Sequence, residues 1–227
     1  MRKIGMSLAA MILKSERDTI EVVEKMAESG FQATFTAMLE MDRQVAVAEL
    51  LNKNGIQYES LHAPSANIND MWLPGDAGEA KLNEFKKCAE HAHAAGAGII
   101  VVHLSSGENA PPVTDIGRDR FTRLVEHADK LNVSIAFENQ RKISNIAWAF
   151  ETFPKGSNVG FCGTAAMKRR LRTEDSICLC SEIGSSVRIF TTITVYSRRI
   201  STFCPLTVRS ISTESPARST NTATKAA

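Results

Sequence analysis

The sequence predicts an α/β fold in which parallel strands alternate with crossover helices. Three observations lead to this prediction. Six short apolar runs of strand length recur within the first 162 of the 227 residues, amphipathic stretches of helical period separate them, and glycines follow several of these stretches. Two parallel strands need a long connection, usually a helix, so this alternation favours a parallel sheet. A doubly wound sheet and a TIM barrel both satisfy the pattern.

The predicted strands are short and almost wholly apolar, as expected of strands that are covered on both faces. They comprise residues 4–8, 31–35, 56–61, 98–102, 133–137 and 159–162. No glycine-rich phosphate-binding loop follows the first of them. This disfavours the dinucleotide-binding version of the doubly wound fold.

The predicted helices carry their apolar side chains on one stripe, which is typical of helices that cover one face of a sheet. They comprise residues 16–28, 43–52, 81–95 and 117–131. Gly30, Gly55 and Gly96 stand just after the first three of these stretches. A left-handed residue is favoured at the carboxyl cap of a helix, so these glycines mark helix ends.

A polar residue ends each of three successive apolar runs. His62 follows the third run, His103 the fourth and Glu138 the fifth. In a TIM barrel, residues at the carboxyl ends of the strands converge on one mouth, where the chemistry takes place. Imidazoles and carboxylates are both metal ligands and proton-transfer groups. The sequence therefore favours the barrel over the doubly wound sheet, and it predicts a site formed by these three residues.

The loops after the two histidines are candidates for ligand contact. The loop after His62 is longer than a plain connection needs. Trp72 in this loop is expected either to form an apolar wall over a sugar ring or to anchor the loop. The loop after His103 offers hydroxyls and backbone amides suited to a polar ligand or a phosphate.

The composition of the chain changes after Cys162. Residues 1–162 contain 17 Lys+Arg and 21 Asp+Glu, a net charge of −4, whereas residues 163–227 contain 10 and 4, a net charge of +6. Ser and Thr together number 16 in the first part and 21 in the shorter second part. The sequence thus predicts a partial barrel over residues 1–162 and an atypical Ser/Thr/Arg-rich tail over residues 163–227 that is disordered or poorly packed.

The bulk properties exclude several classes of protein. No apolar run reaches the roughly 18 to 20 residues of a membrane-spanning helix, so we expect no membrane partner. The five cysteines are an odd number without framework spacing, which favours a reducing, cytoplasmic compartment. Residues 1–162 carry a net negative charge, whereas binding to nucleic acid requires a basic surface, so we expect no nucleic-acid partner. A homo-oligomer stays open.

Three motifs of the chain resemble the sugar phosphate isomerase/epimerase family of xylose-isomerase-like TIM barrels. They are, in this order, Ser60-Leu-His-Ala-Pro, Ile100-Val-Val-His-Leu-Ser-Ser-Gly and Ile135-Ala-Phe-Glu-Asn. The same superfamily contains the endonuclease IV type of DNA repair enzyme. The resemblance covers about residues 1–162 and implies a (β/α)8 barrel. The barrel is expected to be incomplete, because a closed one needs about 250 residues and the matching part supplies five to six strand-helix units.

The resemblance also implies a set of site residues. Family members hold a divalent metal (Mn, Mg, Co or Zn) with a glutamate of the fifth strand, an aspartate of the sixth, a histidine of the seventh and a glutamate of the eighth. Only the first maps onto this chain, at Glu138, which is implied as metal ligand and as catalytic base. His62, His103, Trp72 and Asn139 are the expected substrate-binding residues. Because the other ligands are missing, we expect the metal to be weakly bound or absent.

The activity implied by the resemblance is isomerisation or epimerisation of a small sugar or sugar phosphate. The reaction would be a proton transfer next to a carbonyl, with the cation acidifying the C–H bond and stabilising the enediolate. Because three of the four metal ligands are missing, we expect this chain to have impaired activity. Three alternatives stay open: a keto-polyol dehydratase of the same superfamily, an endonuclease IV-like phosphodiesterase with His62, His103 and Glu138 as zinc ligands, and an inactive binding protein.

The chain departs from the family directly after Cys162. Family members continue with a segment such as Trp-Asp-x-Gly-His-Glu, where this chain has Gly163-Thr-Ala-Ala-Met-Lys-Arg. Regrouping degenerate codons for this stretch by one base gives Trp-Asp-Cys-Gly-His-Glu-Ala, and the same shift over residues 185–194 gives a strand-like Ile-Val-Cys-Thr-His-Ile-His-Asp-Asn-Asn. We hypothesise that the tail is the product of a shifted reading frame. An open barrel with an unpaired strand edge is then expected.

Overall fold

The computed structural model describes residues 3–8, 15–138, 140–153, 157–164, 189–192, 206–207 and 209–210. The strands are β1 (Ile4–Ser7), β2 (Ala33–Ala37), β3 (Gln57–His62), β4 (Ile99–His103), β5 (Ser134–Glu138), β6 (Val159–Thr164), β7 (Ile189–Thr192), β8 (Leu206–Thr207) and β9 (Arg209–Ser210). The helices are α1 (Glu16–Glu28), α2 (Met41–Lys53), the 3-10 helix η1 (Ile68–Trp72), α3 (Asp76–Ala94), α4 (Asp115–Lys130) and α5 (Ile143–Thr152). No helix within these ranges is long and apolar enough to cross a membrane.

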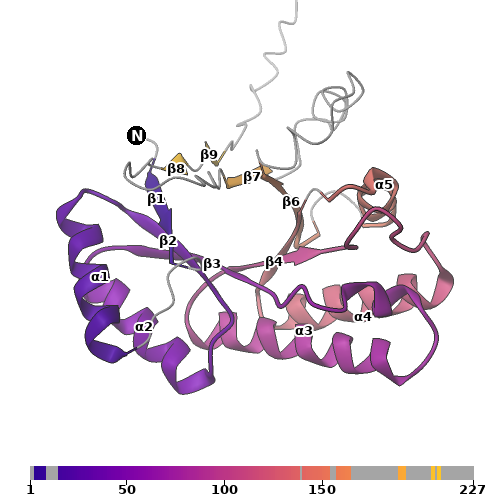
Figure 1. The fold of residues 1–227 in the computed structure, drawn as a ribbon, viewed down its shortest axis with the longest axis horizontal. Helices are drawn as coiled ribbons and strands as arrows, with labels where there is room; N and C mark the ends of the chain where they lie inside the picture. The colour runs from indigo at the N-terminus through magenta and orange to yellow at the C-terminus, as the bar shows by residue number, and fades with distance from the viewer. Residues whose placement is uncertain are drawn as a thin grey trace, which may run out of the picture.

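Strands β1 to β7 form one parallel sheet in the order of the sequence. A helix connects each of the first five strands to the next. Figure 1 shows these helices around the outside of the curved sheet, from α1 beside β1 and β2 to α5 near β6. This repeated strand-helix unit confirms the predicted α/β barrel architecture, with five strand-helix units and a sixth strand in the part of the chain before residue 165.

Two short strands of the tail lie on the edges of the parallel sheet. β8 pairs antiparallel with β1, with Ile4 opposite Thr207, and β9 pairs antiparallel with β7, with Thr191 opposite Arg209. Figure 1 shows β8, β9 and β7 between β1 and β6. The expectation of an unpaired strand edge is therefore wrong at these positions, because β8 pairs with the backbone of β1 and β9 pairs with the backbone of β7. Residues 165–188, 193–205, 208 and 211–227 of the tail lie outside the described residues, and the boundary at residue 162 stays a prediction.

The three glycines that predicted helix ends are confirmed, and the structure adds a cap at the start of α1. Ser15 caps α1, since its Oγ accepts the backbone N–H of Asp18 at 3.1 Å. Gly30, Gly55 and Gly96 follow α1, α2 and α3 with φ values of 79°, 68° and 67°. Only glycine adopts this left-handed conformation at no steric cost, so each glycine ends its helix and turns the chain back toward the sheet.

The main core lies between the sheet and the helices. Val102 of β4 and Phe137 of β5 belong to it together with Phe85 of α3 and Leu124 of α4, and all four side chains are at most 1% exposed. The core residues occupy alternate positions of their strands, Ile100 and Val102 in β4 and Ile135 and Phe137 in β5, which is the period of a strand with one face on the helix layer.

A second, smaller cluster lies on the opposite face of the sheet and consists of Val101, Ala136 and Cys162. Because side chains alternate along a strand, His103 lies on the same face as Val101, and Glu138 lies on the same face as Ala136. The interior of the barrel is thus apolar along the middle of the strands and polar at their carboxyl ends, where the candidate site lies.

Candidate active site

The three polar residues predicted at the strand ends meet at one point. His62 ends β3, His103 ends β4 and Glu138 ends β5. Glu138 Oε2 lies 3.2 Å from His62 Nε2 and 3.0 Å from His103 Nε2. The imidazole rings are edge to face, with centroids 4.9 Å apart. The backbone register brings His103 directly opposite Glu138 in the β4–β5 ladder, which explains the shorter of the two contacts.

The hydrogen bonds of His62 define its protonation. His62 Nδ1 lies 2.8 Å from the carbonyl oxygen of Ala63. A carbonyl oxygen can only accept, so Nδ1 carries the proton. Nε2, which faces the carboxylate of Glu138, must then carry a second proton or share a cation with Glu138, since a bare lone pair would face negative charge. The arrangement therefore favours a positive charge between the imidazole and the carboxylate.

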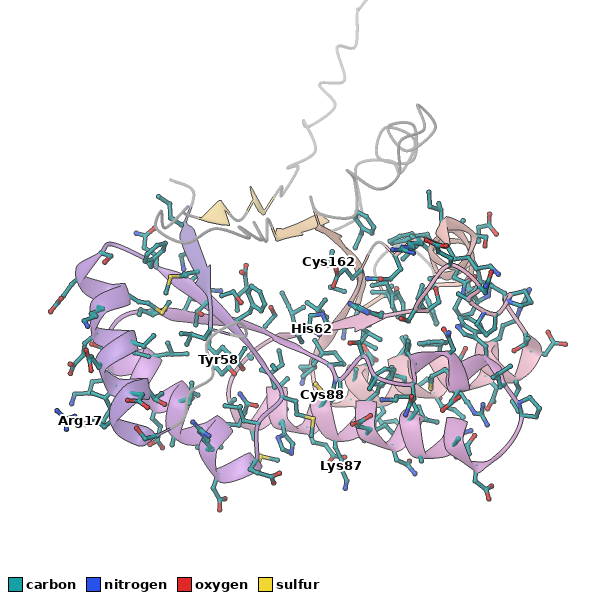
Figure 2. All side chains as sticks on the ribbon, in the orientation of Figure 1. Arg17, Tyr58, His62, Lys87, Cys88 and Cys162 are labelled. Atoms are coloured by element: carbon teal, nitrogen blue, oxygen red, sulfur yellow. The ribbon has the colours of Figure 1, made fainter. Side chains whose placement is uncertain are left out.

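The pKa of His62 lies above its ordinary value. Burial lowers this pKa, but the hydrogen bond and the charge of Glu138, together with the carbonyl of Ala63, raise it by more. The side chains of His62, His103 and Glu138 are 27%, 16% and 10% exposed. A small ligand can thus reach the cluster, while water screens it only partly. Figure 2 shows His62 near the middle of the molecule, away from the helical rim that carries Arg17 and Lys87.

The loops that follow the two histidines are bound to each other. Asn69, in the loop after His62, donates Nδ2–H to the carbonyl oxygen of Ser106 at 3.0 Å and accepts the Ser106 N–H at 2.9 Å. Trp72 donates its indole N–H to the carbonyl oxygen of Leu104 at 2.5 Å. These contacts fix the two loops that follow His62 and His103, so the positions of the imidazoles are preorganised.

Trp72 anchors its loop and does not join the cluster. Its side chain is 0% exposed and packs against Phe121 and Trp148, with ring centroids 4.9 and 5.2 Å away. The indole offers no free face to a sugar ring, so the structure favours the second of the two expectations for this residue. Asn139, the other expected substrate contact, lies outside the described residues.

Arg120 is a site-supporting residue that the sequence reasoning missed. Its side chain is buried, and the guanidinium donates to the carboxylate of Glu79 and to the backbone oxygens of Asp70, Leu73 and Gly75. It thereby holds the loop after His62. A signal for this role was available, since Arg120 falls on the apolar stripe of its helix, where a charge must find partners.

The cluster fits a divalent cation. Its three donor atoms, two imidazole nitrogens and one carboxylate oxygen, lie within 4.8 Å of one another, and it is the one such group found in the described part of the chain. This donor set suits zinc, manganese, cobalt or iron. The Ala63 carbonyl on His62 Nδ1 is the kind of outer partner that orients a metal-bound histidine. Strands β6 and β7 contain no Asp, Glu or His, so they add none of the further family ligands.

The family model described as a xylose isomerase-like TIM barrel matches residues 17–186, which is most of the chain. The chain belongs to this family. The matched range includes β2 to β6 and all three residues of the cluster. The fold class predicted from the strand-end motifs is therefore confirmed.

Several solved structures with the same fold are named as sugar epimerases. A D-tagatose 3-epimerase-like protein superposes with a TM-score of 0.65 at 17% identity, over 83% of this chain and 75% of that one. D-allulose 3-epimerase from Methylomonas sp. gives 0.64 at 17% identity, over 85% and 72%. The 3-keto-D-glucoside 4-epimerase from E. coli gives 0.64 at 14% identity, over 86% and 80%. No curated protein sequence matches the chain.

Proposed function

We propose that this chain binds a divalent metal ion and a small sugar or sugar phosphate at the His62–His103–Glu138 cluster, and that it catalyses isomerisation or epimerisation at a low rate. The observation that carries the proposal is the convergence of three donor groups at the strand ends of a barrel of this family. The sugar ligand is suggested by the similar structures, one of which contains D-allulose. We also infer a cytoplasmic location, since Cys88 is a buried free thiol.

Each residue of the cluster has a proposed role. Glu138 holds the metal ion, and its carboxylate is the base that removes and returns a proton next to the substrate carbonyl. His62 and His103 lie on either side of this carboxylate and bind oxygen atoms of the substrate. A bound metal ion would supply Lewis-acid polarisation of the carbonyl. The loop contacts of Asn69 and Trp72 keep the two imidazoles in place during the reaction.

The same donor count explains why we propose a low rate. Of the four ligands that the family uses, only the glutamate of the fifth strand maps onto this chain. His62 and His103 add two imidazoles beside this carboxylate, but β6 and β7 offer no carboxylate for a second base. An epimerase needs to deliver a proton to the face opposite the one from which it was taken, so a single carboxylate limits the turnover.

Calorimetric titration with Mn²⁺ tests the metal site. We expect a dissociation constant weaker than about 10 µM and its complete loss in Glu138→Gln. Glu126→Gln, on the exposed side of α4, is the matched control and should bind as the wild type does. Binding that survives Glu138→Gln would contradict the proposed site, and stoichiometric binding far tighter than this would contradict the expected weak affinity.

Deuterium incorporation tests the chemistry. We expect slow, Mn²⁺-dependent exchange of a C–H next to the carbonyl of D-allulose, D-fructose or D-tagatose in D₂O, detected by NMR, and no exchange in Glu138→Gln. Loss of water from the sugar would identify the dehydratase alternative. Binding without exchange would identify the inactive binding protein.

One observation favours a second candidate function. Two histidines and one carboxylate are a donor set that catalytic zinc sites use, with the fourth position open to water. This would suit an endonuclease IV-like phosphodiesterase, although the net charge of −4 over residues 1–162 opposes DNA binding. Zinc-dependent incision of a duplex with one abasic site would establish this function in place of the isomerase.

A further inference from the structure

We propose that Phe35 and Ala37 of strand β2 form a subsite beside the cluster that holds the carbon chain of a ketohexose. The ring of Phe35 supports the C–H face of the sugar, and the small side chain of Ala37 leaves the space that these carbons occupy. The proposal rests on the proposed function and adds to it the residues that select a ketohexose over a shorter sugar.

The backbone ladder places the end of β2 next to His62. Ala37 is the register partner of His62, and the backbone N–H of Met38 donates to the carbonyl oxygen of His62 at 3.3 Å. Neighbouring strands lie about 5 Å apart, so a side chain at Ala37 is a direct neighbour of the imidazole if both point to the same face.

The side chains of Phe35 and Ala37 do point to the face that carries the cluster. Thr36 between them is buried, and its Oγ1 hydrogen-bonds the hydroxyl of Tyr58 and accepts the Nε2–H of Gln44 from helix α2. Thr36 therefore faces the helix layer. Because side chains alternate along a strand, its two neighbours face the interior of the barrel.

Both positions are accessible. Ala37 is exposed and Phe35 is partly exposed. Among the described residues, Phe35 belongs to neither the main core nor the smaller interior cluster and does not pack against either of them. A large aromatic side chain that faces inward without joining a core offers its surface to a ligand.

The candidate site opens toward β2 in the part of the chain that the structure describes. The exposed fraction of the side chains rises from 10% at Glu138 to 27% at His62, the member of the cluster nearest to β2. On the opposite side, the register partner of Glu138 is Cys162 of β6, which is buried. A ligand longer than the cluster itself therefore extends over Ala37.

The chemistry of the subsite defines the part of the ligand that it takes. Phe35 and Ala37 carry no polar side-chain group, so they recognise C–H groups of the sugar and no hydroxyl. The face of an aromatic ring is electronegative and attracts the polarised C–H bonds. A ketohexose whose carbonyl lies at the cluster has further carbons to place on β2, whereas the triose dihydroxyacetone has none.

The test measures binding of D-fructose, D-allulose and dihydroxyacetone to the full-length chain with Mn²⁺, by paramagnetic relaxation of the ligand protons. In Ala37→Leu, which fills the subsite, we expect about tenfold weaker binding of both ketohexoses. Phe35→Leu should weaken it about fivefold, and Phe35→Tyr, which keeps the ring, should restore it to within about twofold of the wild type.

Two ligands and two variants serve as controls. Dihydroxyacetone, and Mn²⁺ measured alone by calorimetry, should bind all variants within about twofold of the wild type, since neither ligand reaches β2. Ala94→Leu makes the same change at an exposed alanine at the end of α3, far from the strand ends. Phe150→Leu makes the other change at a partly exposed phenylalanine that packs against Phe161. Both should bind the ketohexoses as the wild type does.

Unchanged affinity for the ketohexoses in Ala37→Leu and Phe35→Leu would overturn the proposal. An equal loss for dihydroxyacetone or for Mn²⁺ would also overturn it, because the two residues would then act through the cluster. If the wild-type chain binds neither ketohexose, the proposed function fails and this proposal fails with it. If the wild type binds them and these two variants bind equally well, only the subsite on β2 is wrong.

Discussion

Glu79 of α3 accepts hydrogen bonds from two arginines of the neighbouring helix α4. Arg123 binds both of its carboxylate oxygens, and Arg120 Nε lies 2.9 Å from Oε1. The hydrogen bonds of Arg123 and then of Arg120 hold the pKa of Glu79 at about 2. Arg120 also carries the loop after His62, so Glu79 connects the outer helices to the support of the site.

This pKa predicts the acid response of the fold. A carboxylate whose pKa is lowered by folding stabilises the protein at pH values above its unfolded pKa, about 4.3 for Glu, and the contribution is lost as the pH falls toward 2. We expect Glu79→Gln to lower the melting temperature at pH 6 and to approach the wild type near pH 2. Glu126→Gln is the control. A gap between Glu79→Gln and wild type that does not change with pH would refute this explanation.

Cys88 of α3 is a buried thiol. Burial, together with the charge of Glu84, raises its pKa to about 12. Because the thiolate is the reactive form, we expect Cys88 to resist iodoacetamide at pH 8 in the native protein and to react quickly in urea. Peptide mass spectrometry would measure both rates. Fast labelling of Cys88 in the native protein would show that α3 opens more readily than its packing implies.

Individual side chains differ in how far the sequence could define them. His62, His103 and Glu138 were predicted because a polar residue at the end of an apolar run has a position set by the backbone alone. The burial of Trp72 and of Arg120 depends on neighbours that are distant in sequence, such as Trp148 and Glu79. No local pattern contains that information.

Gly78 of α3 and Gly117 of α4 leave space for two large side chains. A Cβ on Gly117 of α4 would lie 2.0 Å from Cε3 of Trp72, and a Cβ on Gly78 of α3 would lie 2.0 Å from Nη1 of Arg120. Both contacts are to the two side chains that anchor the loop after His62. The glycines therefore make room for the support of the site.

This packing predicts the effect of a single methyl group. We expect Gly117→Ala to lower the free energy of unfolding by about 2 to 3 kcal/mol, because the buried indole of Trp72 cannot move without losing its own contacts. Gly98→Ala is the matched control, since a Cβ there meets nothing within 4 Å. Urea unfolding of both variants measures the difference. Equal free energies of unfolding of the two variants would show that the Trp72 side chain can move aside at little cost.

Secondary structure was predicted closely where the period of the apolar residues was clear. The predicted range of α1 agrees with the observed one, and β4 and β5 differ from prediction by one residue at each end. The strands include His103 and Glu138 because ladder pairing uses the backbone and does not depend on an apolar side chain. Helix α5 was missed, since it is only 10 residues long and apolar overall, so that few polar positions separate it from an apolar strand or loop.

The pairing of the tail strands predicts how the molecule responds to truncation. A chain that ends at residue 164 would leave β1 and β6 as edges without the partners that β8 and β7 provide. Exposed edges promote association between chains, so we expect more light scattering at equal concentration. A chain that ends at residue 210 keeps these strands and serves as the control. Equal scattering by the two truncated chains would argue against a role of the tail strands.

The coding DNA decides the origin of the tail. Our hypothesis of a shifted reading frame predicts that a one-base shift near codon 163 restores the Trp-Asp-x-Gly-His-Glu segment of the family. In-frame codons incompatible with this regrouping would reject the hypothesis. A repaired chain should bind Mn²⁺ much more tightly than the present one, because the missing carboxylate and imidazole ligands would return.

The pairing of Ile4 with Thr207 joins two segments from opposite ends of the polypeptide. During synthesis Thr207 leaves the ribosome long after Ile4, so the contact between β1 and β8 can form only late. Contacts of such sequence separation slow folding, and until this one forms the unpaired edge of β1 can associate with other chains.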